Sequence, residues 1–432
     1  PATLGNRVAA TVIEATMDDG SLEAQGYTTR DYVAVNEPMI VQEPGTFMND
    51  PNRWQPLALE ISYTQNGQLL PIGPQEFIGP HWGEVTSFAL PEPPESGMPI
   101  DPGDPPYLHD EATDAEFKEK AIEVATYSSL LDPSDGVTVD ISPATWGNAP
   151  LGTNDRAGYE FNPWTNLPYE PVEVPRADFG RVLAEFWADG PDSETPPGHW
   201  NTLANSVVDH PEFERRMAGS GPELDPLEWD VKMYLALNAA VHDAAVAAWG
   251  AKGHYDYVRP ISMIRWMGGL GQSSDPELPS YHPDGLPLIE GQVELITEET
   301  TAPGERHEHL DDHVGEIAIW AWSGNPGDTE SELGGVGWIR AVEWVPYQLS
   351  TFVTPSFAGY VSGHSTFSRA AAEVLTQLTG TPYFPGGLGS WTVPARSLEF
   401  ELGPSVDVPL QWATYYDAAD QAGLSRLYGG IH

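Results

Sequence analysis

Apolar and polar positions along the chain follow different patterns on the two sides of residue 175. Before it, short apolar stretches such as ATVIEAT (10–16) and PLALEISYT (56–64) alternate with segments rich in Pro, Gly, Asn and Asp. Strands of this length are typically bounded by such turn residues. The pattern predicts that residues 1–174 form a loop-rich region with a few short strands, packed on the rest of the chain.

One helix is predicted inside that region. Thr113 followed by Glu116 has the spacing of a capping box, in which two side chains satisfy the first backbone amides of a helix. Apolar residues then recur at helical spacing from Phe117 to Ala125.

Helical patterns dominate after residue 175. Apolar residues form one or more helical faces in RADFGRVLAEFWADG (176–190), EWDVKMYLALNAAVHDAAVAAWGA (228–251), ISMIRWM (261–267), DHVGEIAIWAWSG (312–324), GWIRAVEWVPYQLS (337–350) and the segment from His364 to Leu378. Gly380 can end the last of these helices. We therefore predict a mainly α protein, in which residues 175–432 form a helical bundle.

Composition narrows the possible functions. The chain has 64 acidic against 19 basic residues and a formal net charge of −45, which argues against binding to nucleic acid or to an anionic membrane surface. It has no cysteine, hence no disulfide framework or thiolate metal site, and no apolar stretch of membrane-spanning length. We expect a soluble protein, exported to the extracellular space or periplasm, with the cytoplasm and a homo-oligomer left open. A halophilic or marine source is a hypothesis that the acidity suggests.

Three short blocks carry the candidate chemistry: KGHYDYVRP (252–260), VSGHSTFS (361–368) and SRLYGGIH (425–432). Together they supply three cations, one hydroxyl, one unhindered amide and two imidazoles, from Lys252, Arg259, Ser362, Gly363, His364, Arg426 and His432. Arginine matches two oxygens of a tetrahedral anion and lysine acts as a point charge, so a mixture holds several oxygens at once. Unpaired amides at the start of the helix after Ser362 favour the same anion. The blocks predict a site for phosphate or vanadate.

The backbone at these blocks can also be predicted. Pro260 disfavours a helical conformation for Arg259, which we place on a turn, and Pro260 then starts a helix. Gly253 is expected to interrupt the helix before it. The two glycines between Arg426 and His432 predict a helix packed tightly against a neighbour.

In order and spacing the blocks match K-x6-R-P, S-G-H and S-R-x5-H, and the sequence resembles the vanadium-dependent haloperoxidases of the type 2 phosphatidic acid phosphatase superfamily. The resemblance covers roughly residues 154–432 and implies the family's helical-bundle fold. It also implies oxidation of a halide by hydrogen peroxide to a hypohalous-acid equivalent, which reacts with a small organic acceptor. The implied cofactor is vanadate, which phosphate can replace.

The resemblance implies a role for each residue of the blocks. The groups that would hold the oxygens of vanadate are Lys252, Arg259, Ser362, the Gly363 amide and Arg426. His432 would bond to vanadium as a neutral imidazole, and His364 would act as the acid–base residue. Trp249 and Phe357 occupy positions at which chlorinating members of the family resemble this chain, which favours a halide pocket; the alternative is that both are ordinary core aromatics.

Two other functions remain open. In a phosphatase of the superfamily, His432 would attack phosphorus to form a phosphohistidine and His364 would protonate the leaving oxygen. Alternatively, the chain is a non-enzymatic acidic surface or matrix protein built on this fold. The family continues beyond its last histidine, so we expect the native chain to extend past His432.

Other conspicuous residues have alternative explanations. On a helix, His309, His313 and Glu316 would share one face and could bind a metal, or they form a solvated acidic face. Asp-rich turns such as DPSDG (132–136) suit calcium or simply turn chemistry. His199 follows a Pro-Pro-Gly segment that could line an entrance. His242 is interpreted as a core histidine, because it and Asp243 point in different directions on a helix.

Overall fold

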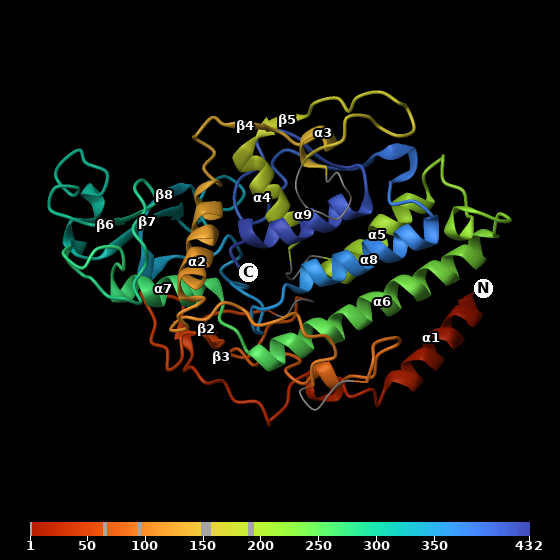
Figure 1. Cartoon of the computed structure of the whole chain (residues 1–432), viewed down its shortest axis with the longest axis horizontal. Coiled ribbons are helices and arrows are strands. Elements are labelled where there is room, and N and C mark those ends of the chain that lie inside the picture. The colour runs from red at the N-terminus through yellow and green to blue at the C-terminus, as the bar shows by residue number, and fades with distance from the viewer. Residues whose placement is uncertain (1, 64–66, 93–96, 148–156, 189–193) are drawn as a thin grey trace.

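The computed structural model describes residues 2–63, 67–92, 97–147, 157–188 and 194–432, and these are mainly helical, as predicted (Figure 1). The helices are α1 (Ala2–Thr16), α2 (Asp114–Ser129), α3 (Pro143–Trp146), α4 (Arg176–Phe186), α5 (Thr195–Val208), α6 (Pro226–Tyr255), α7 (Pro260–Leu270), α8 (Gly363–Thr379) and α9 (Tyr415–Tyr428). The strands are β1 (Met39–Ile40), β2 (Leu57–Leu59), β3 (Gly73–Pro74), β4 (Thr138–Asp140), β5 (Glu173–Pro175), β6 (Val293–Leu295), β7 (Ile317–Trp322), β8 (Val336–Arg340), β9 (Gly389–Val393) and β10 (Val408–Trp412).

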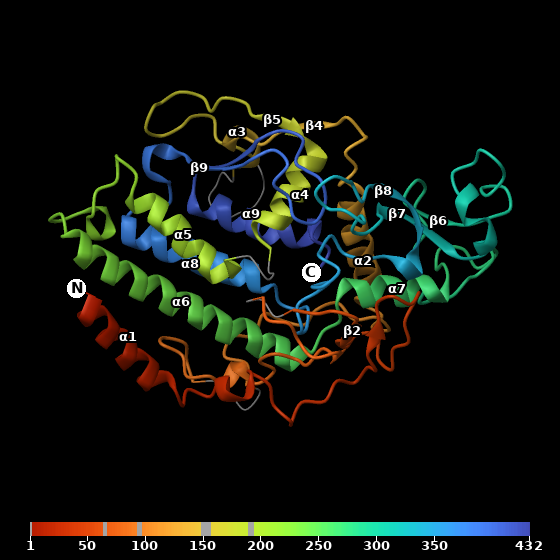
Figure 2. The ribbon, with the colours of Figure 1, turned by 180° about the vertical axis from the view of Figure 1, so that it is seen from behind.

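Helices α5, α6 and α8 lie side by side, and α9 packs on α8 and on α4 (Figures 1 and 2). A three-stranded sheet, β6–β7–β8, lies with α7 at the other end of the molecule (Figure 2). The packed faces of the helices share one large apolar core that contains Trp200, Leu237 and Leu375. This bundle is the scaffold on which the site described below is built.

The long helix α6 follows directly from its sequence. Asp225 caps it by accepting a hydrogen bond from the amide of Leu227, and Pro226 occupies the first position, where a missing amide costs nothing. Residues at intervals of four then give it a buried face: Trp229, Met233, Leu237 and Val241. The helix ends at Asp256, whose φ of 46° turns the chain.

Helix α8 has clear start and stop signals. Ser362 is its cap and accepts a hydrogen bond of 3.2 Å from the amide of Ser365. Gly380 ends it in the left-handed conformation, with φ 75°, where an added Cβ would lie 2.3 Å from the carbonyl carbon of Ala218. The predicted helix and its end at Gly380 are confirmed.

The N-terminal region departs from the prediction in two places. The segment ATVIEAT, predicted as a strand from its β-branched residues, belongs to α1, because Leu4, Val8 and Val12 impose a helical period over a longer window. The capping box before α2 does not form, since the Thr113 hydroxyl bonds to the backbone of Tyr107 instead. The helix itself and the strand within PLALEISYT are confirmed.

Two helices predicted after residue 300 are wrong. Residues 312–324 contain β7, and residues 337–350 contain β8, which pairs antiparallel with it; Ile319 lies opposite Ile339. Five of the six residues of β7 are buried, so its apolar run does not alternate. Without alternation, a strand buried on both faces cannot be told from a buried helix by pattern alone.

Two backbone predictions around the blocks are also wrong. Gly253 does not interrupt α6; its missing side chain instead admits the Pro80 carbonyl, which an added Cβ would approach to 2.1 Å. The glycines Gly429 and Gly430 follow α9 and form a turn rather than a helix. The predicted boundary between residues 174 and 175 lies next to the start of α4 and stays a prediction. Among the described residues, no helix is both long enough and apolar enough to cross a bilayer.

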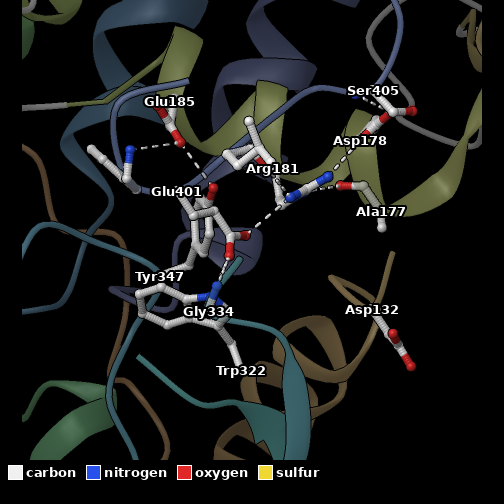
Figure 3. Close-up of polar contacts among 12 residues, drawn as sticks. Asp132, Ala177, Asp178, Arg181, Glu185, Trp322, Gly334, Tyr347, Glu401 and Ser405 are labelled. Atoms are coloured by element: carbon white, nitrogen blue, oxygen red, sulfur yellow. Dashed lines mark hydrogen bonds and ion pairs between the residues drawn. The ribbon is translucent and has the colours of Figure 1, made fainter. Parts of the chain in front are cut away.

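Helix α4 is fixed by a buried polar network (Figure 3). The Arg181 guanidinium pairs with Asp178 and, at 3.2 Å, with Glu401, and all three residues are 1% exposed. One helical turn on, the Glu185 carboxylate accepts hydrogen bonds from the Tyr347 hydroxyl at 2.8 Å and from a backbone amide, and burial raises its pKa to about 8. Both sets of contacts join α4 to Tyr347 and to residues 399–405, so they set the position of the helix.

Replacing Arg181 with Met should therefore destabilise the protein strongly. The change leaves the carboxylates of Asp178 and Glu401 buried without their cation, which typically costs about 3–5 kcal/mol. Urea unfolding of Arg181→Met and wild type measures the loss. The control is Lys232→Met, whose partly exposed ion pair with Glu228 should contribute less than about 1 kcal/mol. Equal, small losses in both variants would show that the network does not hold α4.

Candidate active site

The seven residues of the three sequence blocks line a single cavity of about 340 Å³. They are Lys252, Arg259, Ser362, Gly363, His364, Arg426 and His432. They come from the last turn of α6, the start of α7, the N-terminus of α8, the last turn of α9 and the segment after it. The fold thus joins groups that are more than 170 residues apart.

The local backbone explains how the first block serves one site with two cations. The left-handed conformation of Asp256 ends α6, and Arg259 has extended backbone angles, φ −100° and ψ 152°, as predicted for a residue before proline. Lys252 therefore projects from the end of one helix and Arg259 from the start of the next, and both side chains enter the same cavity.

Backbone carbonyls of residues 357–359 hold both cations. The Lys252 ammonium donates to the carbonyls of Ala358, at 2.8 Å, and Gly359, at 3.0 Å. The Arg259 Nε donates to the carbonyl of Phe357 at 2.9 Å. Lys252 is 1% exposed and Arg259 4%, so these contacts replace the lost water around buried charges.

The end of α4 holds the remaining cation and one histidine. The Arg426 Nη2 donates to the carbonyl of Ala184 at 3.0 Å, and the His364 Nε2 lies 2.6 Å from the carbonyl of Trp187. These carbonyls lie at the C-terminal end of α4, where the helix dipole is negative and favours a cation. No sequence motif marks Ala184 or Trp187 as part of the site.

The hydrogen bond of His432 determines which of its ring nitrogens carries the lone pair. Nδ1 lies 3.1 Å from the carbonyl of Gly359, which can only accept, so Nδ1 carries the proton and Nε2 the lone pair. Burial, followed by the charges of Lys252 and Arg259, lowers the pKa of His432 to about 3. The ring is thus a neutral imidazole with a basic nitrogen, as a metal ligand or a nucleophile requires.

His364 is fixed in the complementary tautomer. Its Nε2 donates to the carbonyl of Trp187, which leaves the lone pair on Nδ1. Burial lowers the pKa of His364 well below its ordinary value, and the charges of Arg426 and Lys252 act in the same direction. An anion among these cations would oppose that effect and make Nδ1 a stronger base.

The two aromatic residues of the predicted halide pocket lie beside the cations. The ring centroids of Trp249 and Phe357 are 4.7 Å apart, and the Lys252 ammonium is 5.7 Å from the first and 5.2 Å from the second. Both rings are buried in the core and also line the cavity. Among the described residues that line the cavity, none is acidic. Three cations thus line this cavity in a protein whose formal net charge is −45.

The second predicted metal site does not assemble. Residues Glu308–His313 form a 3₁₀ segment, and Glu316 lies beyond it, so the helical face that the spacing required is absent. His313 bonds to Glu316 at 2.9 Å, whereas His309 turns to the carbonyl of Trp338. Within the described ranges, no three His, Cys, Asp or Glu residues are placed to hold a metal ion.

The calcium prediction gains no support at residues 132–136. Asp132 accepts hydrogen bonds from the amide and hydroxyl of Ser134. Asp135 accepts from the amide of Val137 and pairs with Arg176. Turn chemistry and one ion pair account for both carboxylates.

Two further histidines are placed differently from expectation. His199 does not line the cavity; it packs against Phe186 and Trp187, and burial lowers its pKa to about 4. It therefore lies behind the residue whose carbonyl orients His364. His242, predicted as a core residue, is half-buried and lines the cavity.

Comparison with known proteins identifies the fold around this cavity. Residues 232–432 match the family model described as the VCPO second helical-bundle domain, and this range contains all three blocks. The structure is similar to an apo-type bacterial vanadium-dependent chloroperoxidase, with TM-score 0.58 and 17% identity over 99% of this chain and 68% of that one. The holo-type bacterial enzyme gives TM-score 0.54 and 18% identity over 99% and 67%. No curated protein sequence matches the chain. The chain thus has a VCPO-like fold, as the resemblance implied.

An anion that enters the cavity should stabilise the folded protein. Phosphate that binds only the native state should add about 2.7 kcal/mol at a hundred times its Kd. Thermal unfolding with and without phosphate measures this gain. Arg426→Met should remove it, whereas Arg369→Met, which loses the same charge from the exposed face of α8, should keep it. Stabilisation that persists in Arg426→Met would place the anion elsewhere.

His432 should make the anion-free protein sensitive to acid. Its native pKa is about 3 against an ordinary 6.5, so between these values the unfolded chain binds a proton that the native state does not. Stability should fall as pH decreases through that window, by about 1.6 kcal/mol between pH 6.5 and 5. Urea unfolding at both pH values should show a smaller decrease for His432→Asn than for wild type. An identical decrease would mean that His432 titrates normally.

Proposed function

We propose that this chain, which carries a VCPO-like helical bundle, is a vanadate-dependent haloperoxidase. It would use hydrogen peroxide to oxidise a halide to a hypohalous-acid equivalent that halogenates a small organic acceptor. The observation that carries the proposal is the joint presence, in one cavity, of three buried cations, a helix N-terminus and two neutral histidines with assigned tautomers. A structural protein would need none of these.

The donor set fits vanadate. The positive charges of Lys252, Arg259 and Arg426 match an oxyanion, and Ser362 with the Gly363 amide stands at the N-terminus of α8. The lone pair on His432 Nε2 is a suitable metal ligand, and the carbonyl of Gly359 orients its ring as second-layer groups do in metal sites. When bound, vanadate would supply a Lewis-acid centre that activates peroxide without a redox change in the protein.

His364 would transfer the protons of the reaction. Anion binding cancels part of the repulsion from Arg426 and Lys252, so Nδ1 becomes able to accept a proton from incoming peroxide. The resulting imidazolium is stabilised by the Nε2 hydrogen bond to the carbonyl of Trp187. The same histidine can return the proton to a departing oxygen, which makes it the acid–base residue.

The aromatic pair favours halide chemistry over phosphate transfer. Trp249 and Phe357 present apolar rings within 6 Å of the Lys252 ammonium. A large, weakly hydrated halide is suited to a niche that combines one cation with apolar walls. Phosphoryl transfer requires cations around the anion but has no need of such a niche.

Phosphatase activity is the second candidate, because the same arrangement suits it. With its proton on Nδ1, His432 has a nucleophilic Nε2 among cations that would stabilise a pentacoordinate phosphorus. His364 would then protonate the leaving oxygen. Incubation with an aryl phosphate, beside peroxide, bromide and a phenol with and without vanadate, distinguishes the two. Vanadate-dependent halogenation supports the first; phosphate release alone would replace it with the second.

The role of His364 gives a quantitative prediction. Removal of a general acid–base group typically lowers kcat by about 10²- to 10⁴-fold. His364→Ala should lose halogenation to this extent while it still binds vanadate, since the cations and His432 remain. The matched control Arg369→Met should retain both properties. Full activity in His364→Ala would remove the histidine from the mechanism.

A further inference from the structure

The cavity extends well beyond the anion-binding groups. Its lining residues on α6 are Asn238, Val241, His242, Ala245, Trp249 and Lys252, which form one stripe because, apart from the adjacent Val241 and His242, they recur every three or four positions. At about 1.5 Å per residue, the stripe from Asn238 to Lys252 covers about 21 Å along the helix. Asn238 is exposed and Lys252 is 1% exposed, so the cavity opens at the first and closes at the second.

The walls between these ends are apolar. Val241 and Ala245 face the cavity from α6, Phe367 from α8, and Ile78 with Trp82 from the N-terminal region. The indole N–H groups are used elsewhere: Trp82 donates to the carbonyl of Ser21 at 3.1 Å. Trp249 likewise donates to the carbonyl of Ile78 at 2.9 Å. The indole groups therefore contribute ring surface to the cavity.

Among the described residues between the cations and solvent, the polar ones lie at the mouth. The side-chain amides of Asn238 and Asn201 pair with each other, and His242 Nδ1 lies 3.2 Å from Asp243. A molecule that enters thus passes a polar rim, then an apolar stretch, and finally the cations. The volume of the cavity, about 340 Å³, lies within the range of about 300–1,000 Å³ that is typical of small-molecule sites. A tetrahedral anion of five heavy atoms fills only a small part of it.

We propose that the apolar stretch binds the organic acceptor itself, and that this acceptor is an apolar, aromatic or chain-like molecule. The inference rests on the proposed haloperoxidase function and specifies where its product forms. Halogen would be transferred inside the cavity, close to Trp249, before it reaches solvent. A polar acceptor would lose its hydration along these walls without compensation.

The balance of the transfer is simple. Peroxide takes two electrons from the halide and is reduced to water, with one proton consumed. A carbon–hydrogen bond of the acceptor breaks, a carbon–halogen bond forms, and the released proton combines with the second oxygen of peroxide. The sum is RH + X⁻ + H₂O₂ + H⁺ → RX + 2 H₂O.

Binding of 1-naphthol, followed by its fluorescence, tests the site without any cofactor. Ala245→Trp fills the apolar stretch and should weaken binding at least about tenfold, the effect of a few misplaced carbons in an apolar pocket. Val241→Asn keeps the side-chain size, adds polarity and should also weaken binding. The control Leu235→Trp adds the same ring to an exposed position of the same helix and should bind as wild type does. Equal binding by all four proteins would overturn the proposal.

Competition shows whether halogenation occurs there. With peroxide, bromide and vanadate, wild type should halogenate 1-naphthol in preference to a phenol coupled to dextran, which is too large to enter. Ala245→Trp should shift the products toward the dextran phenol, and an unchanged ratio would overturn the proposal. Loss of naphthol binding in Ala245→Trp together with no halogenation by wild type would support the binding site and overturn the haloperoxidase function.

Discussion

The site depends on three consecutive backbone carbonyls. Those of Phe357, Ala358 and Gly359 accept hydrogen bonds from Arg259, Lys252 and His432, and so connect the end of α6, the start of α7 and the segment after α9. Gly359 must be a glycine, because an added Cβ would lie 2.6 Å from the carbonyl of Val258. One short loop thereby places two cations and an imidazole around the same cavity.

Positive groups are costly to bury, and in the part of the chain that the structure describes backbone carbonyls help to stabilise them. Lys252, Arg259 and Arg426 are each at most 4% exposed, and backbone carbonyls of residues 357–359 and of α4 accept hydrogen bonds from them. Carbonyls orient a cation without cancelling its charge, so the attraction for an anion is kept. Carboxylates are used one layer further out, where Asp178, Glu401 and Arg181 fix α4 (Figure 3).

The sequence predicts the helices of the bundle and the charged residues of the site, because both leave local signals. The period of apolar residues predicts α4, α6, α7 and α8, and the residue types in three blocks suffice to suggest an anion site. The apolar period does not predict β7, because this buried strand has no alternation of apolar and polar residues. Gly253 was expected to interrupt α6, but the structure uses its missing side chain for a close approach by Pro80. The carbonyls of Ala184, Trp187 and Gly359 could not be predicted, since every residue has a carbonyl and only tertiary structure selects these.

The most direct test of the proposed vanadate site is a crystal structure of the protein soaked with orthovanadate, in which the anomalous signal locates the metal. We expect a single strong peak bonded to Nε2 of His432, with oxygens within hydrogen-bond distance of Lys252, Arg259 and Arg426. His364 should face the bound group from within the same cavity. A peak outside the cavity, or one inside it that lacks a bond to His432, would show that the three blocks do not form a vanadate site with His432 as its ligand.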